Sequence, residues 1–403
     1  MTEAKIVVQR DREKPILNKH PWIFSRAIRE VQGSPQPGDI VTVVGENGRF
    51  LARGYWNPKS QIQVRLLTWQ DEPIDDEWWA LALDRAFSSR AIDSYSTAYR
   101  LVNAENDFIP GLVIDRYGYD EFGKDWLVIQ ALTLGIEVRK QLITDLCMDL
   151  LQPNGIYERS DVDVRAKEGL KAVSGLLDGE PPPNPLVILE EEVPLFVDVE
   201  HGHKTGFYLD QRRNRTKLME RAAEFDGEAR VLNLFSYTGA FGLRTASAHD
   251  QAHIINVDAS NDALEIGDKN AAEIEVAKRV EYVQADVFDF LRDQVDEKAE
   301  YELVVCDPPK FAHNAGQIER AARGYKDLNL NAFKLVKPGG YLMTFSCSGA
   351  ITRDLFQKIV FGALADSGRQ GQIVEFLSAN DDHPVALTFP EGEYLKGLLV
   401  RVY

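Results

Sequence analysis

The sequence predicts an α/β protein whose C-terminal half folds into a doubly wound, mostly parallel sheet. The first observation is that short apolar runs alternate strictly with helical segments from residue 231 onward. This alternation is typical of βαβ units that stack into a parallel sheet. The runs expected as strands are 231–237, 253–258, 280–286, 301–307, 340–347, 372–378 and 394–403. Because no helical segment separates the last two, we expect the seventh strand to insert antiparallel.

The second observation is the order of residues in the first βαβ unit, 231–259. A buried strand leads into a turn at Thr238 and Gly239, and the next strand ends on Asp258. This acid lies nineteen residues after Gly239. Nucleotide-binding units place a ribose-binding carboxylate at a spacing of about 20 residues. The full G-x-G-x-x-G pattern is absent, so a βαβ unit without a ligand stays an alternative at this point.

Two smaller domains are expected before this sheet. Residues 1–75 contain short alternating segments separated by Gly, Pro and Asn turns, which predicts a small β domain. Residues 76–185 predict a separate α+β unit, and its last seven residues, GEPPPNP, have the composition of a linker. Residues 186–403 then form the third domain, which carries the large sheet.

Composition excludes several classes of protein. A formal charge of −17 argues against general nucleic-acid binding. No apolar stretch approaches the roughly 18 residues that cross a membrane, and the N-terminus lacks the apolar core of a signal peptide. Three cysteines without a C-x-x-C pair do not form a disulfide framework, and we expect no metal site. The expected compartment is therefore the reducing cytoplasm.

A local basic surface is nevertheless expected near the N-terminus. Residues 1–31 carry seven Lys and Arg against four acids. This region contains the stretch KHPWIFSRAI, whose basic residues are Lys19, His20 and Arg26. One interpretation is that the two aromatic residues, Trp22 and Phe24, belong to the core. The other is that the basic residues flank an RNA-contacting surface.

Polar residues occupy the ends of the expected strands, where open α/β sheets bind their ligands. The second, third, fourth and fifth strands end on Asp258, Asp286, Asp307 and Cys347. The first strand ends at the turn SYTG, where backbone amides are available at a helix N-terminus. A single strand-end carboxylate is often only a helix cap. Three acids and a thiol on one edge of a sheet indicate a binding site.

The motifs NLFSYTGAFG, NVDAS, QADVFDFL, DPPKF and FSCS together resemble a class I S-adenosylmethionine-dependent methyltransferase, with a Rossmann-like seven-stranded sheet. More narrowly, the whole chain resembles the bacterial 23S ribosomal RNA cytosine-C5 methyltransferase I family. Its HPWIF stretch marks a PUA RNA-binding domain, and HKTGFYLDQRRNR matches the segment before the catalytic sheet. The resemblance implies S-adenosylmethionine as cofactor and 23S ribosomal RNA as partner, with no membrane. Oligomeric state stays open, and a homodimer is one option.

The resemblance also implies which residues contact the cofactor. The SYTG turn and Gln211 would hold its methionine end. Asp258 would accept hydrogen bonds from the ribose hydroxyls, and Asp286 from the adenine amino group. The residues implied at the cofactor are Gln211, Phe235, Tyr237, Thr238, Gly239, Asp258, Asp286 and Asp307.

Methylation of carbon 5 of cytosine requires a nucleophile, because a thiolate must first add to carbon 6. Cys347 is the expected nucleophile, and its small polar neighbours on either side are expected to leave room for a base. Cys306 is expected to be buried, since strand alternation points it away from Asp307. Lys310 stands where commoner RNA cytosine-C5 methyltransferases carry a second cysteine. Asp307, Lys310 and a water molecule are therefore all candidates for the base that removes the carbon-5 proton.

Two other functions fit parts of the same pattern. The D-P-P motif followed by an aromatic residue also suits methylation of a base nitrogen, such as guanine N2, which needs no nucleophile. A non-catalytic ribosomal RNA-binding assembly factor could keep the same fold. The intact acids on all three cofactor-facing strands argue against that second alternative.

Overall fold

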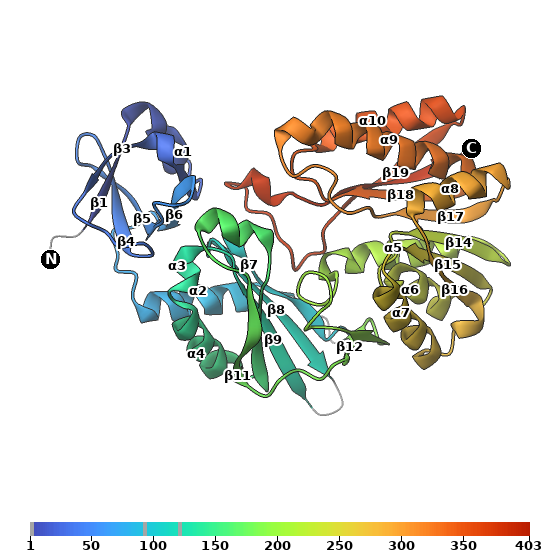
Figure 1. Ribbon diagram of the computed structural model, residues 1–403, viewed down its shortest axis with the longest axis horizontal. Coiled ribbons are helices and arrows are strands. Elements are labelled where there is room, and N and C mark those ends of the chain that lie inside the picture. The colour runs from blue at the N-terminus through green and yellow to red at the C-terminus, as the bar shows by residue number, and fades with distance from the viewer. Residues whose placement is uncertain (1–3, 92–94, 120–122) are drawn as a thin grey trace. The chain divides into compact units, whose positions relative to one another are not determined.

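The computed structural model describes residues 4–91, 95–119 and 123–403, and the chain forms two compact units (Figure 1). The first unit comprises residues 1–189, 197–209 and 381–392. The second comprises residues 190–196, 210–380 and 393–403. Segments far apart in the sequence therefore belong to the same unit.

The first unit begins with a six-stranded sheet in the order β2-β6-β5-β4-β1-β3. Neighbouring strands are antiparallel except β1 and β4, which run parallel. Its elements are β1 (Lys5–Val8), α1 (Glu13–Leu17), β2 (Trp22–Phe24), β3 (Ile28–Gln32), β4 (Ile40–Gly45), β5 (Phe50–Trp56) and β6 (Ile62–Thr68). Alternating apolar residues fill its core, among them Ile6, Val41, Val43, Val64 and Leu66. The strands predicted for the N-terminal region are therefore present.

The exposure of the side chains of β2 distinguishes between the two interpretations of its aromatic residues. Ile23 faces the core, and only 2% of it is exposed. Trp22 is half-buried, whereas Phe24 is 47% exposed. Because successive side chains of a strand point to opposite faces, both aromatics lie on the face away from Ile23. The interpretation that both belong to the core is wrong.

A five-stranded sheet follows in the same unit, in the order β11-β10-β9-β8-β7. Strands β9 and β10 are parallel and the other pairs antiparallel. Asp75 caps the helix before this sheet by accepting a hydrogen bond from the Trp78 backbone N–H at 3.0 Å. The elements are α2 (Asp76–Ser88), β7 (Ala98–Asn103), β8 (Leu112–Tyr119), β9 (Lys124–Ala131), α3 (Leu134–Glu137), α4 (Lys140–Leu151), β10 (Gly155–Ser160) and β11 (Val173–Gly179). The chain then continues through β12 (Leu186–Glu190) and β13 (Val193–Val197).

The second unit contains a seven-stranded sheet in the order β16-β15-β14-β17-β18-β20-β19. The first five of these strands are mutually parallel, and β20 runs antiparallel to both β18 and β19. The strands are β14 (Ala229–Leu234), β15 (Ala252–Asp258), β16 (Val280–Gln284), β17 (Tyr301–Cys306), β18 (Val336–Ser346), β19 (Gly371–Ser378) and β20 (Lys396–Val402). The predicted doubly wound α/β fold is confirmed, as is the antiparallel last strand.

Helices cover both faces of this sheet, α5 to α7 on one face and α8 to α10 on the other (Figure 1). They are α5 (Arg212–Ala222), α6 (Ala240–Ala248), α7 (Asn261–Glu273), α8 (Val287–Asp296), α9 (Ile318–Leu335) and α10 (Arg353–Ser367). The central strands β14 and β17 are buried on both sides, which explains why most of their residues are apolar. In the described part of the chain, no helix is both long and apolar enough to cross a membrane.

The carboxyl ends of the parallel strands differ slightly from the sequence-based boundaries. β14 ends at Leu234, three residues before the expected end. The cause is the backbone of the following turn, where Phe235 and Tyr237 have φ angles of 57° and 52°. These left-handed conformations are incompatible with an extended strand. The turn that carries the SYTG motif therefore begins earlier than the apolar pattern suggests.

Candidate functional site

The turn after β14 is fitted closely against the neighbouring strands. Gly239 has a φ of 79°, a conformation that favours glycine. A Cβ atom at this position would lie 2.8 Å from Nδ2 of Asn256 and 2.9 Å from the ring of Tyr282. Three left-handed positions, at 235, 237 and 239, alternate with ordinary ones in this one turn. Backbone strain of this kind is concentrated at functional sites.

Two hydroxyl groups of the same turn are buried without a hydrogen-bond partner among the described residues. They belong to Ser236 and Thr238, which are 8% and 2% exposed. Helix α6 begins immediately after the turn, and no side chain caps its first N–H groups. Unpaired buried polar groups are rare in proteins, and a helix N-terminus attracts anions. The turn therefore fits a ligand that carries a carboxylate and hydrogen-bonding groups, such as an amino acid.

Two predicted acids lie at the ends of β15 and β16. Asp258 is half-buried, and its carboxylate accepts the N–H groups of Tyr237 at 2.8 Å and Ser260 at 2.9 Å. It thereby fixes the turn after β14 and still has lone pairs for a ligand. Asp286 is the N-cap of α8 and accepts the N–H of Phe288 at 2.9 Å. Asp286 therefore has the capping role that strand-end acids often have.

Asp307 follows β17 and is held by a residue from outside the sheet. Its Oδ2 accepts a hydrogen bond from Nε2 of Gln211 at 2.9 Å. The other end of the Gln211 amide accepts from Nδ2 of Asn214 at 2.5 Å, and Asn214 also donates to the Ser378 carbonyl at 3.0 Å. Gln211 and Asn214 are each 2% exposed. The structure therefore brings Gln211 and Asp307 together, and Asn214 is a buried supporting residue that sequence reasoning missed.

The thiol of Cys347 lies against the loop that carries Asp307. Cys347 is half-buried, and its Sγ lies 3.9 Å from the Pro308 carbonyl oxygen. Lys310, in the same loop, is exposed. Cys306 is fully buried, as predicted, and burial together with the charge of Asp307 raises the pKa of its thiol. Of the two cysteines near this edge of the sheet, only Cys347 is accessible.

The two serines beside Cys347 do not line open space, which corrects the expectation that they leave room for a base. Both are fully buried and bond to Tyr325 of α9, with O···O distances of 2.9 Å from Ser346 and 3.1 Å from Ser348. Ser348 Oγ also accepts the N–H of Ala312 at 3.2 Å. These bonds join the end of β18, helix α9 and the loop after β17. Tyr325 is a second residue that sequence reasoning missed, since it lies in the middle of an amphipathic helix.

A third residue that the sequence did not single out is Lys396, the first residue of β20. It is 2% exposed, and its Nζ donates to the carbonyls of Ser348 at 2.9 Å and Ile351 at 2.7 Å. The available signal was a lysine at the start of an otherwise apolar strand, LKGLLVRVY. A charged residue in such a position needs a specific reason to be buried.

The predicted basic residues near the N-terminus lie in the first unit. Lys19 and Arg26 are exposed, and Nε2 of His20 lies 3.3 Å from Glu391. A pocket of about 560 Å³ adjoins this pair; its lining includes Arg12, His20, Trp22, Phe24, Arg26 and Glu391. The Trp22 ring packs at 4.8 Å against Phe389, from the segment 381–392. The pocket thus combines aromatic rings with guanidinium groups, and Lys19 is not among its lining residues.

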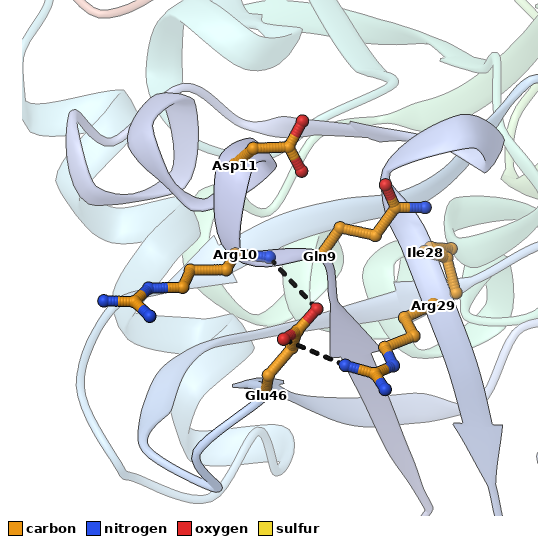
Figure 2. Close-up of a pocket in the computed structure, with 6 residues that line it drawn as sticks. All are labelled: Gln9, Arg10, Asp11, Ile28, Arg29 and Glu46. Carbon is orange, nitrogen blue, oxygen red and sulfur yellow. Dashed lines mark hydrogen bonds and ion pairs between the residues drawn. The ribbon is translucent and has the colours of Figure 1, made fainter.

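Another pocket, on the first sheet, has a volume of about 580 Å³ (Figure 2). None of its lining residues is one for which the sequence predicts a functional role. Glu46 lies between two arginines there, as Figure 2 shows. It accepts the Arg10 backbone N–H at 3.4 Å and pairs with the Arg29 guanidinium at 2.9 Å. Among the residues that the structure describes, no cluster of three or more His, Cys, Asp or Glu could hold a metal ion.

Two domain families match this chain. A PUA-like domain matches residues 6–69, and an S-adenosylmethionine-dependent methyltransferase domain matches residues 165–398. Curated relatives called ribosomal RNA large subunit methyltransferase I match nearly the whole chain. The protein from Tolumonas auensis is 45% identical over 98% of both chains, and that from Shewanella amazonensis is 46% identical over 99% of both.

Solved structures also share the fold of this chain. A Streptococcus mutans protein described as a SAM-dependent methyltransferase superposes with a TM-score of 0.82 at 21% identity, covering 98% of this chain and 99% of that one. A second structure, assigned as a methyltransferase and complexed with SAH, has a TM-score of 0.83 at 21% identity over the same shares. S-adenosylmethionine is therefore the cofactor of this domain.

The burial of the three thiols predicts their reactivity in the native protein. Cys147 and Cys306 are fully buried, and burial raises the pKa of Cys147 to about 12. We therefore expect iodoacetamide at pH 8 to alkylate Cys347 at least roughly tenfold faster than either buried cysteine. Peptide mass spectrometry of the native protein measures the rates, and protein unfolded in guanidinium is the control, where the three rates converge. Rapid labelling of Cys306 in the native state would contradict the assignment.

Proposed function

Because the chain belongs to the ribosomal RNA large subunit methyltransferase I family, we propose that it methylates carbon 5 of a cytosine in 23S ribosomal RNA. The reaction proceeds through a covalent adduct between Cys347 and carbon 6 of the base. The observation that carries this proposal is the accessible thiol at the end of β18, which lies 3.9 Å from the Pro308 carbonyl of the loop that bears Asp307. A methyltransferase acting on a base nitrogen needs no such thiol.

The cofactor is held by the carboxyl edge of β14, β15 and β16. Its methionine end lies at the turn after β14, where the hydroxyls of Ser236 and Thr238 lack partners among the described residues. Asp258 accepts hydrogen bonds from the ribose hydroxyls with the lone pairs that its backbone contacts leave available. Asp286 takes the adenine amino group while it caps α8. Phe235, Tyr237 and Gly239 form the turn. Gln211 and Asp307 line the opposite side of the cofactor site.

Bound S-adenosylmethionine would supply the electrophilic methyl group of its sulfonium, and the sulfur would keep the electron pair of the broken bond as a neutral thioether. The thiolate of Cys347 adds to carbon 6 of the cytosine, and the C5–C6 double bond supplies the electron pair that makes carbon 5 nucleophilic. Once carbon 5 carries the methyl group, a base removes its proton. The electrons of that C–H bond restore the C5–C6 double bond, and the Cys347 thiolate leaves. Each turnover therefore regenerates the cysteine.

The proton-removing base lies in the loop after β17. Asp307 is one candidate, oriented by the 2.9 Å hydrogen bond from Gln211. Lys310 is exposed in the same loop, and a water molecule held there is the third candidate. The burial of Gln211 and Asn214 favours Asp307, because a fixed carboxylate needs no rearrangement before it accepts a proton.

RNA binding is the function of the outer face of β2 and its pocket. Phe24 presents an exposed ring on which an unpaired base can stack, and Arg26 is an exposed cation for a phosphate. Lys19 and His20 extend this basic surface. Because the whole chain is acidic, local cations supply the attraction that its net charge of −17 opposes.

The two types of RNA contact should respond differently to salt. Phe24→Ala should weaken binding of a 23S RNA fragment by about 1–3 kcal/mol with an unchanged salt slope, because stacking involves no counterion. Arg26→Ala should lower the salt slope by about one phosphate contact. Filter binding or fluorescence anisotropy at several salt concentrations measures both. Phe361→Ala, which removes a 68% exposed ring from α10, is the matched control and should bind normally. Unchanged binding by both β2 variants would refute this surface.

The role of Asp258 can be tested separately from catalysis. Asp258→Ala should weaken S-adenosylmethionine binding by about 1.5–3 kcal/mol, because it removes acceptors for ribose hydroxyls. Asp258→Asn keeps one acceptor oxygen and should lose less. Asp289→Ala removes an exposed carboxylate on α8 and serves as the control. Isothermal titration calorimetry on the folded variants gives the dissociation constants. Equal constants for Asp258→Ala and the wild type would show that this acid does not contact the cofactor.

The nucleophile is tested with the substrate. Cys347→Ala should abolish methylation and leave S-adenosylmethionine binding nearly intact, whereas Cys306→Ala should remain active. RNA carrying 5-fluorocytosine at the target should form a stable adduct with the wild type, because fluorine leaves no carbon-5 proton for elimination. Peptide mass spectrometry should locate the adduct on Cys347.

The same experiments distinguish the alternatives. Methylation by Cys347→Ala, with a nucleoside product modified on nitrogen, would favour a base-nitrogen methyltransferase. Absence of methylation by the wild type on every ribosomal RNA substrate, with RNA binding retained, would favour an assembly factor. Mapping methylated positions in RNA from cells with and without the protein identifies the target nucleotide.

A further inference from the structure

Lys396 is a buried lysine that forms no ion pair with any of the described residues. Its Nζ donates to two backbone carbonyls, those of Ser348 and Ile351. Among the residues that the structure describes, no carboxylate lies within ion-pair distance of this ammonium group. The nearest acid in the sequence, Glu393, pairs instead with Arg353 at 2.7 Å. Burying an ammonium group without a carboxylate is unfavourable, so its presence here points to a role.

The two carbonyls bonded by Lys396 delimit the turn that follows Cys347. This turn runs from Ser348 to Ile351, and the same Ser348 is bonded through its side chain to Tyr325 and to the N–H of Ala312. Lys396, on β20, therefore bonds to the backbone of the turn, and Tyr325, on α9, bonds to the Ser348 side chain. The position of the Cys347 thiol depends on both supports.

The charge of Lys396 also acts on the thiol directly. Besides Cys347, the charged groups that influence its ammonium are Glu393, before β20, Arg353, on α10, and Lys310, in the loop after β17. Lys310 and Arg353 repel the ammonium, whereas Glu393 and a Cys347 thiolate attract it. Attraction between a cation and an anion is mutual, so the buried ammonium favours the thiolate over the neutral thiol.

We propose that Lys396 is the positioning residue of Cys347: it fixes the turn after the thiol and stabilises the thiolate. This inference rests on the proposed role of Cys347 as nucleophile. A free thiol with an ordinary pKa of about 8.5 is mostly protonated at neutral pH, so the nucleophile needs a neighbouring cation before substrate arrives. Lys396 supplies one inside the protein, where solvent screens it less than the exposed Lys310.

The pH range of this effect follows from the lysine itself. Burial lowers the pKa of Lys396 to about 8, with Glu393 and Cys347 acting in the opposite direction. The ammonium is therefore mostly protonated at pH 7 and is lost as pH rises through about 8. Its support of the thiolate should be largest near neutral pH and should disappear in alkaline solution.

The test compares alkylation of Cys347 across pH 6 to 10 in the full-length protein without RNA. Lys396→Gln keeps an amide donor for the turn but removes the charge, and Lys396→Met removes both. In each variant we expect the midpoint of the rate profile to move upward by about half to one pH unit, which lowers the rate at pH 7 about three- to tenfold. Lys396→Arg keeps the charge, so the midpoint of its rate profile should lie close to that of the wild type. Unfolding temperature and S-adenosylmethionine binding verify that each variant is folded.

The outcomes separate this inference from the proposed function. An unchanged midpoint in folded Lys396→Gln and Lys396→Met would overturn the electrostatic role. An altered midpoint only in Lys396→Met would also overturn it, because hydrogen bonding alone would then account for the effect. If the midpoints move as expected while Cys347→Ala still methylates carbon 5, the coupling of Lys396 to the thiol stands and the nucleophile assignment falls.

Discussion

The arrangement of the candidate site depends on a buried hydrogen-bond network around the end of β18. Tyr325 contacts both serines that flank Cys347, and Ser348 in turn accepts the N–H of Ala312 from the loop after β17. Lys396 binds the backbone of the same turn from the neighbouring strand. Three elements, α9, β18 and β20, thus restrain one thiol. Fully satisfied polar networks in a low-dielectric interior are rigid, and rigidity is what a positioned nucleophile requires.

A second network links the segment before the sheet to the same edge. The carbonyl at the end of β19 binds Asn214, which binds Gln211, which binds Asp307. Asp307, in the loop after β17, and the turn after β18 are therefore held by different side chains, although Ser348 also bonds to Ala312 in the loop after β17. This division is consistent with one set orienting a carboxylate and the other a thiol. The acids at the ends of β15 and β16 are held differently, by backbone N–H groups. Asp286 accepts from the start of α8, and Asp258 accepts from Ser260 and from Tyr237 in the turn after β14.

Much of the fold and of the site follows from local sequence. Strand alternation, the strand-end acids and the burial of Cys306 are all consequences of periodicity and topology, which sequence displays. The residues that support the site cannot be recognised in this way. The sequence pattern identifies Tyr325 only as a core aromatic residue of α9 and Lys396 only as a cation at the start of a strand. Nothing local shows that Tyr325 bonds to two serine hydroxyls or that Lys396 bonds to two carbonyls after β18. The turn at Phe235 was also missed, since a left-handed backbone at a non-glycine residue has no sequence pattern of its own.

The route of the chain through its two units has a consequence for their separability. The backbone passes between the units at five places: 189/190, 196/197, 209/210, 380/381 and 392/393. A protease that cuts one connection leaves four others intact, and no contiguous fragment contains one complete unit without part of the other. Truncation from either end therefore cannot separate one unit from the other. Glu391 in the first unit and Lys396 in the second are only five positions apart along the chain.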